Sequence, residues 1–522
     1  MALTESELND LQSLMQDERF DDAIVAARGM LRRNADVPLL YNVMGVAMMQ
    51  TGRPDDATRA FQRAHAMAPD YTEVTHNLVA ALIGTGRVAE AEAPIRAALR
   101  DRPGDPSLLR NLASALVLKA DWPAAQEAAK QAMIAEPGHP AARVMLASIQ
   151  REQGQLTEAL ETLAPLADVA EAQLVRGEIL AAQGEPGAAR AAFEAALALD
   201  PAEVAAWEGI AAVTTFAPDD PRLDRLRAAL DAASGEARTR LSFVLARALA
   251  DSGADAQVFA LLDTAQAVRR QQAPAYSHAQ RRKEIGRIRT LFGPEQVAAL
   301  SAQGRTDVQP VFLIGMPGTA AETVARALAA HPQIHATDAP GAIPGLGRAV
   351  LAAPRVMTPD WVAARAGALA SGASDAPRLF DPTPANADWA GLILTLFPKA
   401  RIVHVTRDPR ATALDLYAQD MPAEPFPWAH DLEDIASYHA QLDALIEHWQ
   451  AQFPDAFVTC RYEGLRADPD PQLRALAEAL GLAPHPAMME ALDAPGAFED
   501  WTRHEDALAP FIRAMARQDR PL

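Results

Sequence analysis

Cysteine is nearly absent from this chain of 522 residues, because Cys460 is the only one. One cysteine cannot form a disulfide within the chain, and it cannot supply a cysteine-rich zinc site. The lack of disulfides fits a reducing compartment, so we expect a cytoplasmic protein. Aromatic residues are also scarce, at 5% of the chain. A chain that is poor in aromatics and rich in alanine favours closely packed helices over a β-sandwich.

Long apolar runs are missing as well. No stretch of about 18 apolar residues occurs, so we expect no membrane insertion. The first residues, 1–7, are acidic and lack the basic segment and apolar core of a secretory signal. The formal net charge is −20, from 68 acidic and 48 basic residues. This balance argues against a general partner that is a nucleic acid or an anionic membrane.

Lysine is the scarcest charged residue, since the basic side chains include only Lys119, Lys130, Lys283 and Lys399. Any anion site must therefore use arginine, backbone amides or hydroxyl groups. Hydrophobic residues make up 49% of the chain and charged residues 22%. These fractions are ordinary for a folded globular protein and exclude disorder as the main state.

The first half of the chain contains an internal repeat. Starting from Gly45 and stepping by 34 residues, small residues, large apolar residues and a proline return to the same places in three consecutive units. The small residues stand where two helices would cross closely, and the proline stands where the second helix would end. The recurring positions are Tyr41, Met44, Met48, Ala57, Phe61, Ala64 and Pro69, then Thr75, Leu78, Leu82, Ala91, Ile95, Ala98 and Pro103, then Leu109, Leu112, Leu116, Ala125, Ala129, Ala132 and Pro137.

This pattern resembles the tetratricopeptide repeat, a helix–turn–helix unit of about 34 residues. Weaker copies on both sides, including one around Gly177 and Phe193, extend it to about six units. Stacked helix pairs form a superhelix, and its concave face usually binds a protein or peptide segment. The resemblance therefore implies such a segment as the partner of the repeats.

Residues 235–305 predict further helices. Apolar stripes lie at 241–249 and 258–262, as expected for helices that bury one face. The basic stretches Arg269-Arg270 and Arg281-Arg282-Lys283 indicate a solvated helix face. Alternatively, they form a basic patch that faces an anionic partner.

The pattern changes at Pro310. The apolar run 311–314 predicts a buried strand, residues 315–319 a loop, and residues 323–330 a helix. Two more strands, 401–405 and 456–460, alternate with helical segments and predict a mostly parallel sheet. A strand, a tight loop and a helix present backbone N–H groups to a phosphate. The chain has no G-x-x-x-x-G-K-[ST] motif and no G-x-G-x-x-G motif after a strand, so a Walker-type kinase or ATPase is not supported.

Several of these segments resemble the bacterial sulfotransferase family, whose members use 3′-phosphoadenosine 5′-phosphosulfate (PAPS). Many members carry tetratricopeptide repeats before the catalytic domain, and the family is related to the protein-tyrosine sulfotransferases. The resemblance covers roughly residues 236–520. The matching segments are 311–317, 331–333, 401–410, 461–465 and 467–469, together with Trp501, Glu505 and Leu508.

The resemblance implies a fold class and a cofactor. We expect an α-solenoid followed by an α/β domain with a mostly parallel sheet and a P-loop-like sulfotransferase fold. The expected domains are a repeat superhelix at 1–234, a helical connector at 235–305 and the α/β domain at 306–522. If the protein is active, PAPS is its cofactor, and otherwise it needs none. The residues at cofactor-binding positions of the family are Gly315, Pro317, Gly318, Thr319 and Arg407.

The first loop departs from the family's pattern of Pro, a basic residue, Ser, Gly, Thr and Thr. The residues present are Pro317, Gly318, Thr319, Ala320, Ala321 and Glu322, so the basic residue is missing and an acid stands at a phosphate-binding position. A carboxylate beside a phosphate is repulsive in a poorly solvated site. The loop therefore predicts weak nucleotide binding.

The second phosphate position keeps Arg407, but the serine that the family has eight residues later is Asp415. Alternatively, Arg407 forms a structural ion pair with Asp408 at the start of a helix. The family's arginine before a C-terminal tryptophan is Asp500 here. Three positions that face phosphate in the family thus carry acids.

The catalytic positions have changed as well. Ala339 stands where the family has its glutamate base, and Asp338 is the one candidate replacement. The family motif Asp-Lys-x-Pro-x-Asn has Pro382 in place of its lysine. His404 is expected to be a core residue, and His430, His439 and His448 lack a metal-ligand spacing, so we expect no metal site.

Two functions therefore remain open. In the first, the sulfotransferase domain is degenerate, and the protein serves with its repeats in protein–protein interaction. In the second, it is an active PAPS-dependent sulfotransferase that transfers a sulfuryl group to a hydroxyl of a protein or saccharide. The sequence indicates neither the acceptor nor the oligomeric state.

Overall fold

A computed structural model describes residues 4–337, 340–370, 378–492, 500–518 and 520. The chain forms two compact units, Met1–Thr214 and Thr215–Leu522. Within the described residues, no helix is both long enough and apolar enough to span a membrane.

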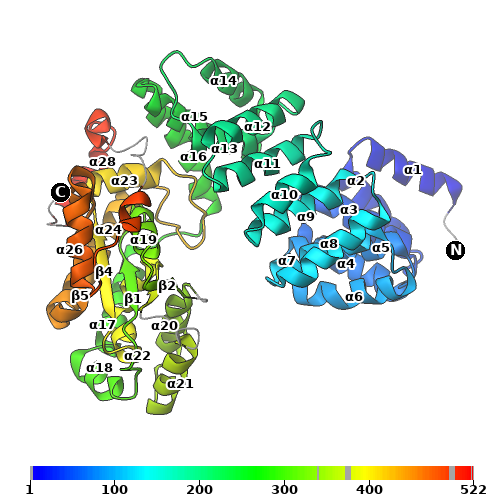
Figure 1. The fold of residues 1–522 in the computed structure, drawn as a ribbon. Helices are drawn as coiled ribbons and strands as arrows, with labels where there is room; N and C mark the ends of the chain where they lie inside the picture. Colours follow the sequence, from blue (N-terminus) through cyan, green and yellow to red (C-terminus); the bar gives the residue numbers. More distant parts are fainter. Residues whose placement is uncertain (1–3, 338–339, 371–377, 493–499, 519, 521–522) are drawn as a thin grey trace. The chain divides into compact units, whose positions relative to one another are not determined.

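The first unit is a succession of helices in which each helix packs against the next (Figure 1). Prolines mark the helix boundaries: Pro38 and Pro106 stand at the first helical positions of α3 and α7. Pro69 and Pro103 follow the ends of α4 and α6, as the repeat pattern predicted. The helices are α1 (Glu5–Gln16), α2 (Phe20–Leu31), α3 (Pro38–Gln50), α4 (Pro54–Met67), α5 (Thr72–Gly84), α6 (Val88–Asp101), α7 (Pro106–Leu118), α8 (Trp122–Ala135), α9 (Pro140–Glu152), α10 (Leu156–Leu163), α11 (Ala170–Ala182), α12 (Pro186–Leu199) and α13 (Val204–Val213).

Two glycines show why small residues recur where the paired helices cross. A Cβ atom at Gly45 in α3 would lie 2.5 Å from the ring of Phe61 in α4. A Cβ atom at Gly177 in α11 would lie 2.4 Å from the ring of Phe193 in α12. The same close contact thus forms in two separate repeats, because only a glycine lets the phenylalanine ring reach the partner helix.

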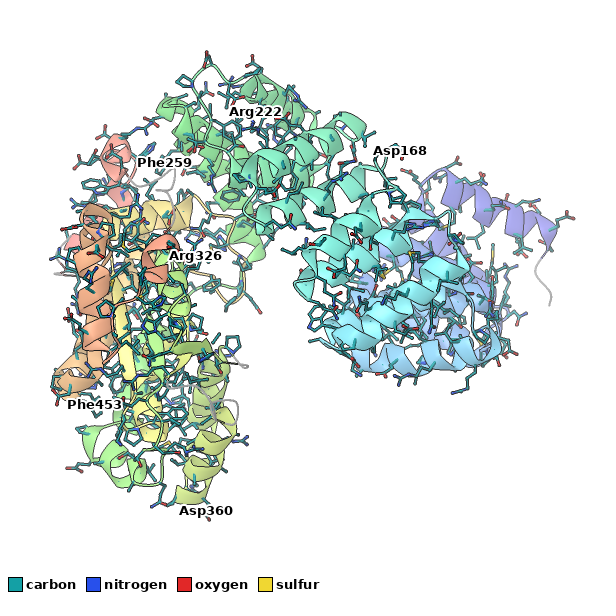
Figure 2. All side chains as sticks on the ribbon, in the orientation of Figure 1. Asp168, Arg222, Phe259, Arg326, Asp360 and Phe453 are labelled. Atoms are coloured by element: carbon teal, nitrogen blue, oxygen red, sulfur yellow. The ribbon has the colours of Figure 1, made fainter. Side chains whose placement is uncertain are left out.

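The second unit begins with helices that precede the sheet. These are α14 (Arg222–Ala232), α15 (Gly235–Asp251), η1 (Asp255–Gln257), α16 (Val258–Gln272), α17 (His278–Leu291) and α18 (Pro294–Ser301). They pack against the α/β part through Phe259 of α16, which is labelled in Figure 2. Its ring lies 6.1 Å from that of Tyr417 and 5.6 Å from that of His504. The connector helices 235–301 therefore share the compact unit of the sheet.

A five-stranded parallel sheet forms the centre of this unit, in the order β2-β3-β1-β4-β5. All four residues of β1 are buried, as expected for the middle strand of a parallel sheet covered on both faces. The predicted fold class is confirmed. The strands are β1 (Val311–Ile314), β2 (Ile334–Ala336), β3 (Arg378–Asp381), β4 (Arg401–Thr406) and β5 (Phe457–Arg461).

The strand order reverses at β1, because β1 lies between β3 and β4. In open α/β sheets, ligands bind outside the carboxyl ends of the strands at such a reversal. The loops that follow β1 and β4 meet at this point. The remaining elements are α19 (Ala321–Ala329), α20 (Ala342–Ala352), η2 (Pro354–Val356), α21 (Pro359–Leu369), η3 (Pro384–Trp389), α22 (Ala390–Leu396), α23 (Pro409–Tyr417), α24 (Leu432–Gln452), η4 (Pro454–Ala456), α25 (Tyr462–Ala467), α26 (Pro469–Ala479), α27 (Ala487–Glu490), η5 (Trp501–His504) and α28 (Ala509–Ala516).

Candidate functional site

The loop between β1 and α19 has a backbone that only certain residues can adopt. Gly318 has a φ of +85°, and a Cβ atom there would lie 2.9 Å from the carbonyl oxygen of Thr412. At Gly315, a Cβ atom would lie 3.0 Å from the carbonyl oxygen of Val405. Ala320 takes the left-handed conformation with φ of 56° just before α19 begins. The loop is therefore held tightly against β4 and α23, and α19 begins directly after it.

Thr319, the loop's surviving hydroxyl residue, is 3% exposed. Its Oγ1 donates a hydrogen bond of 2.7 Å to the carbonyl oxygen of Met316, and its N–H donates one of 3.2 Å to the same atom. Both donors of this residue are thus used to close the loop. Glu322, in the first turn of α19, is exposed.

Arg407 follows β4 directly, and its side chain is only 5% exposed. Its Nη1 donates to the carbonyl oxygen of Gly318 at 2.9 Å and to Oδ2 of Asp415 at 3.2 Å. The guanidinium carbon lies 5.1 Å from the ring centre of Tyr462, a cation–π contact. Arg407 therefore joins the β1 loop, α23 and the start of α25.

Asp415 is the acidic partner in this arrangement. Its side chain is 30% exposed, yet protein atoms around the carboxylate remove much of its hydration, and this burial raises its pKa. The positive charge of Arg407 acts in the opposite direction, and the negative charge of Glu322 raises the pKa further. The carboxylate thus lies in a setting that is already unfavourable for negative charge.

Comparison with known proteins assigns both units. Residues 310–486 match the family model described as Sulfotransferase family. Tetratricopeptide-repeat models match residues 11–72, 48–116, 116–175 and 170–213. The chain combines tetratricopeptide repeats with a sulfotransferase-family domain.

Individual relatives are distant. An uncharacterized protein from Aquifex aeolicus (strain VF5) is 25% identical over 280 residues, which cover 46% of this chain and 36% of that protein. The chain thus spans about a third of the length of this curated relative. A thermophilic tetratricopeptide-repeat protein from Thermus thermophilus is 20% identical over 34% of this chain and 98% of its own, with a TM-score of 0.32. The type IV pilus biogenesis factor PilW is 21% identical over 40% of this chain and 99% of its own, with a TM-score of 0.36.

The sulfotransferase-family domain does not form the ion pair between Arg407 and Asp408 that the sequence left open. Asp408 pairs with Arg410 instead, with 2.6 Å between Oδ2 and Nη2. Its Oδ1 also accepts the backbone N–H of Arg410 at 2.8 Å, which caps the start of α23. Arg410 in turn stacks on Trp501, with its guanidinium carbon 3.8 Å from the ring centre.

The other family positions are dispersed or structural. Asp338, the candidate base, lies outside the described residues. Asp500 is exposed and accepts the backbone N–H of Thr502 at 3.2 Å, which caps η5. Asn386, in the altered Asp-Lys-x-Pro-x-Asn motif, is fully buried, and neither amide atom has a hydrogen-bond partner among the described residues.

The histidines give no sign of a metal centre in the described part of the sulfotransferase-family domain. The Nδ1 atom of His404 on β4 lies 3.4 Å from Nε2 of Gln450. Burial lowers the pKa of His404 to about 4. His430 bonds through Nδ1 to Oε1 of Gln266 at 2.8 Å. His439 pairs with Asp443 at 2.9 Å. Within the ranges that the structure describes, no cluster of three metal-ligating side chains occurs.

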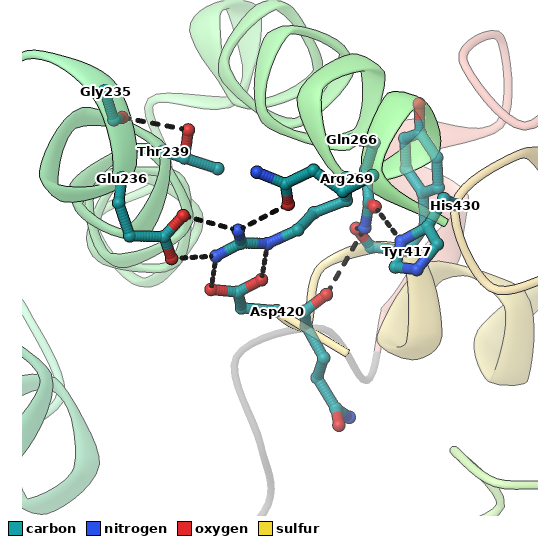
Figure 3. A network of polar contacts seen from close by, with 10 residues as sticks. Gly235, Glu236, Thr239, Gln266, Arg269, Tyr417, Asp420 and His430 are labelled. Carbon is teal, nitrogen blue, oxygen red and sulfur yellow. Dashed lines mark hydrogen bonds and ion pairs between the residues drawn. The ribbon is translucent and has the colours of Figure 1, made fainter. Parts of the chain in front are cut away.

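Two arginines differ from the solvated face that the sequence indicated. Arg269 is 9% exposed and pairs with Glu236 and Asp420, each at 2.6 Å (Figure 3). Arg281 is 8% exposed and pairs with Asp388. The basic stretches in the sequence could not reveal that these two arginines are buried, because these acidic partners lie 33 or more residues away. The pairs with Asp420 and Asp388 fasten the connector helices to the sulfotransferase-family domain.

Proposed function

We propose that the sulfotransferase-family domain is degenerate and that the protein serves, with its repeats, in protein–protein interaction. The observation that supports this proposal is the state of Arg407. Its guanidinium is already bound by Asp415 and by the carbonyl oxygen of Gly318. The cation that would hold a nucleotide phosphate is therefore engaged within the protein.

Electrostatics oppose a phosphate at this position. A phosphate that contacted Arg407 would also approach Asp415. Two unit charges at about 4 Å repel by about 4 kcal/mol at an effective dielectric constant of about 20. Glu322 adds negative charge close enough to raise the pKa of Asp415. Thr319 offers no compensation while its hydroxyl is bonded to Met316.

The repeats supply the proposed interaction. Tetratricopeptide stacks generally bind protein partners on their concave face, and we propose that a protein or peptide segment binds there.

We retain the domain limits 1–234, 235–305 and 306–522 as a prediction. We also propose a cytoplasmic location, because the single cysteine, Cys460, forms no disulfide within the chain.

Titration of the full chain with 3′-phosphoadenosine 5′-phosphate, the product of PAPS, tests the proposal. We expect no binding at millimolar ligand, and the same result for Arg407→Ala. Micromolar binding that is lost in Arg407→Ala would overturn the proposal.

A double variant tests whether Asp415 and Glu322 are the cause of the expected lack of nucleotide binding. If acids block an otherwise intact site, Asp415→Ser with Glu322→Thr should restore measurable binding of the same ligand. The matched control, Asp470→Ser with Glu478→Thr, removes two acids from α26 and should restore none. Equal binding by the two double variants would show that net charge, and not the identity of these acids, governs affinity.

The alternative is an active PAPS-dependent sulfotransferase that acts on a hydroxyl of a protein or saccharide. One observation favours it: the glycine loop and the start of α19 keep the strand–loop–helix shape that binds phosphates. In that case Gly315, Pro317, Gly318, Thr319 and Arg407 would hold PAPS, and Asp338 would be the candidate base. Transfer of labelled sulfate from PAPS to an acceptor, abolished in Arg407→Ala, would establish this function.

A further inference from the structure

A groove of about 990 Å³ lies outside the candidate nucleotide site. Its walls are the second half of α17, the start of α18 and the end of α20 with η2. Figure 1 shows these helices beside the sheet at the end away from the loops that follow β1 and β4. We call this feature the α17 groove. Its floor is apolar and includes Leu291, Leu351 and Met357.

The charge of the α17 groove is opposite to that of the chain. The chain carries a net charge of −20, yet the groove is lined by Lys283, Arg287 and Arg355, and no carboxylate is among the lining residues that the structure describes. The side chains of Lys283 and Arg355 form no ion pair or hydrogen bond with the described residues, in contrast to those of the buried Arg269 and Arg281. The two cations are thus available to a partner's acidic groups.

Gly286 leaves the backbone of α17 uncovered beside the groove. It lies in the middle of α17, is exposed and lines the groove. A Cβ atom there would meet no described protein atom within 4 Å. Glycine is less favourable than alanine inside a helix, and no packing contact among the described residues requires it at this position. A glycine here does allow another molecule to approach the helix backbone closely.

The walls of the groove are fixed to each other. Nη2 of Arg287 donates a hydrogen bond of 2.6 Å to the carbonyl oxygen of Leu351 in the last turn of α20. A cation is favourable at the C-terminal end of a helix, where carbonyl groups lack partners. The groove is thus organised before any partner binds, which reduces the entropic cost of binding.

We propose that the α17 groove docks an acidic segment of a partner protein, with an apolar side chain seated on the floor. The cations are distributed over both walls, with Lys283 and Arg287 on α17 and Arg355 on η2. Several separated carboxylates match this distribution better than the single head group of a lipid does. The exposed Val356, 41% exposed beside Arg355, extends the apolar surface at the rim. This proposal goes beyond the proposed function and does not depend on the state of the nucleotide site.

Fluorescence anisotropy of the full chain with a labelled ten-residue peptide of alternating Glu and Leu tests the proposal. We expect saturable binding that weakens as salt concentration rises. Lys283→Gln with Arg355→Gln should weaken binding at least tenfold. The control Arg365→Gln with Lys399→Gln removes the same charge outside the groove and should leave binding within twofold. Equal loss in both double variants, or no binding to the wild type, would overturn the proposal.

The Gly286→Gln variant tests whether filling the α17 groove prevents peptide binding when no charge is removed. A Cβ atom at this position meets no described protein atom within 4 Å, and the rest of the glutamine side chain would occupy the groove, so the variant should melt no lower than the wild type and yet bind the peptide at least tenfold more weakly. Gly345→Gln, at an exposed glycine of α20 with equally open surroundings, should bind the peptide normally.

A second experiment measures binding of the full chain to anionic vesicles of phosphatidylglycerol. Vesicle binding that requires Lys283 and Arg355, without peptide binding, would overturn the proposal in favour of a lipid surface.

Discussion

At the scale of single residues, Arg407 shows how a ligand-binding position can become structural. Its side chain is 5% exposed and joins a loop carbonyl, a carboxylate and an aromatic ring. A buried guanidinium requires such partners, because an unpaired buried charge is strongly unfavourable. Asp415 provides inside the chain the negative charge that a phosphate would otherwise provide.

Asp415→Ala should therefore destabilise the second unit. Breaking a buried ion pair costs about 3–5 kcal/mol, and the partial exposure of Asp415 reduces the expected loss to about 1–3 kcal/mol. Urea unfolding followed by tryptophan fluorescence measures it. Asp470→Ala is the control, because Asp470 and Arg474 are more than half exposed, and its effect should stay below about 0.5 kcal/mol. Equal losses in the two variants would show that Arg407 does not depend on its partner.

His404 should make the fold sensitive to acid. Burial lowers its pKa from 6.5 to about 4 in the folded chain, so the unfolded chain binds the proton more readily. The stabilisation is complete above about pH 6.5 and is lost as the pH falls toward 4. Between pH 7 and 5, the wild type should lose about 2 kcal/mol more than His404→Gln does. His335→Gln, at an exposed position of β2, should lose as much as the wild type, and urea unfolding at both pH values gives the comparison.

At the scale of elements, the close crossings of paired helices explain why the repeats could be predicted from the sequence. Gly45→Ala would place a Cβ atom 2.5 Å from Phe61, and such overpacking typically costs about 1–3 kcal/mol. Thermal unfolding of the helices by circular dichroism should show the loss, and Phe61→Leu in the same chain should recover part of it. Gly29→Ala in α2, where a Cβ atom meets nothing within 4 Å, should instead stabilise the helix by up to about 1 kcal/mol. A loss of stability in Gly29→Ala would mean that glycine itself, and not packing, governs these positions.

The periodic elements were predictable because burial leaves a signal in the sequence. Gly45 and Phe61 recur as Gly177 and Phe193, and the strand Val311–Ile314 is wholly apolar. The strands β2 and β3 were not identified. β2 has only three residues, of which His335 and Ala336 are exposed, and β3 begins with the charged Arg378. Such strands are determined by pairing with their neighbours and not by their own composition.

The candidate site was predictable in position but not in its contacts. The order of the motifs placed the loop at Gly315–Thr319 and Arg407 at the end of a strand, and the structure has both there. The sequence left open whether Arg407 binds a ligand or pairs with Asp408. In the structure, Arg407 pairs with Asp415. Arg407 stands just before α23 and Asp415 lies near the end of that helix, so their spacing of eight residues did not by itself reveal the contact. The burial of Arg269 and Arg281 depended on acids distant in the sequence, which no local pattern reveals.

At the scale of the whole molecule, the connector helices determine which fragments can fold. Gln266 donates a buried hydrogen bond of 2.8 Å to the carbonyl oxygen of Tyr417, and Arg269 pairs with Asp420 (Figure 3). The side chain of Phe292 packs directly against Gly391, where an added Cβ atom would lie only 2.4 Å away. Removing residues 215–305 would expose these groups and leave Asp388 and Asp420 without their arginines.

We therefore expect the fragment 215–522 to fold alone and the fragment 306–522 to fail, although the latter contains every described strand of the sheet. The fragment 215–522 should unfold cooperatively at nearly the temperature of the second unit in the full chain, measured by tryptophan fluorescence. The fragment 306–522 should aggregate or unfold without cooperativity, because apolar surface that the connector covers would face water. The fragment 1–214 is the control, and it should keep a helical circular dichroism spectrum, since each repeat packs only on its neighbours. Cooperative unfolding of 306–522 would show that the connector is an accessory to the sulfotransferase-family domain and not part of its core.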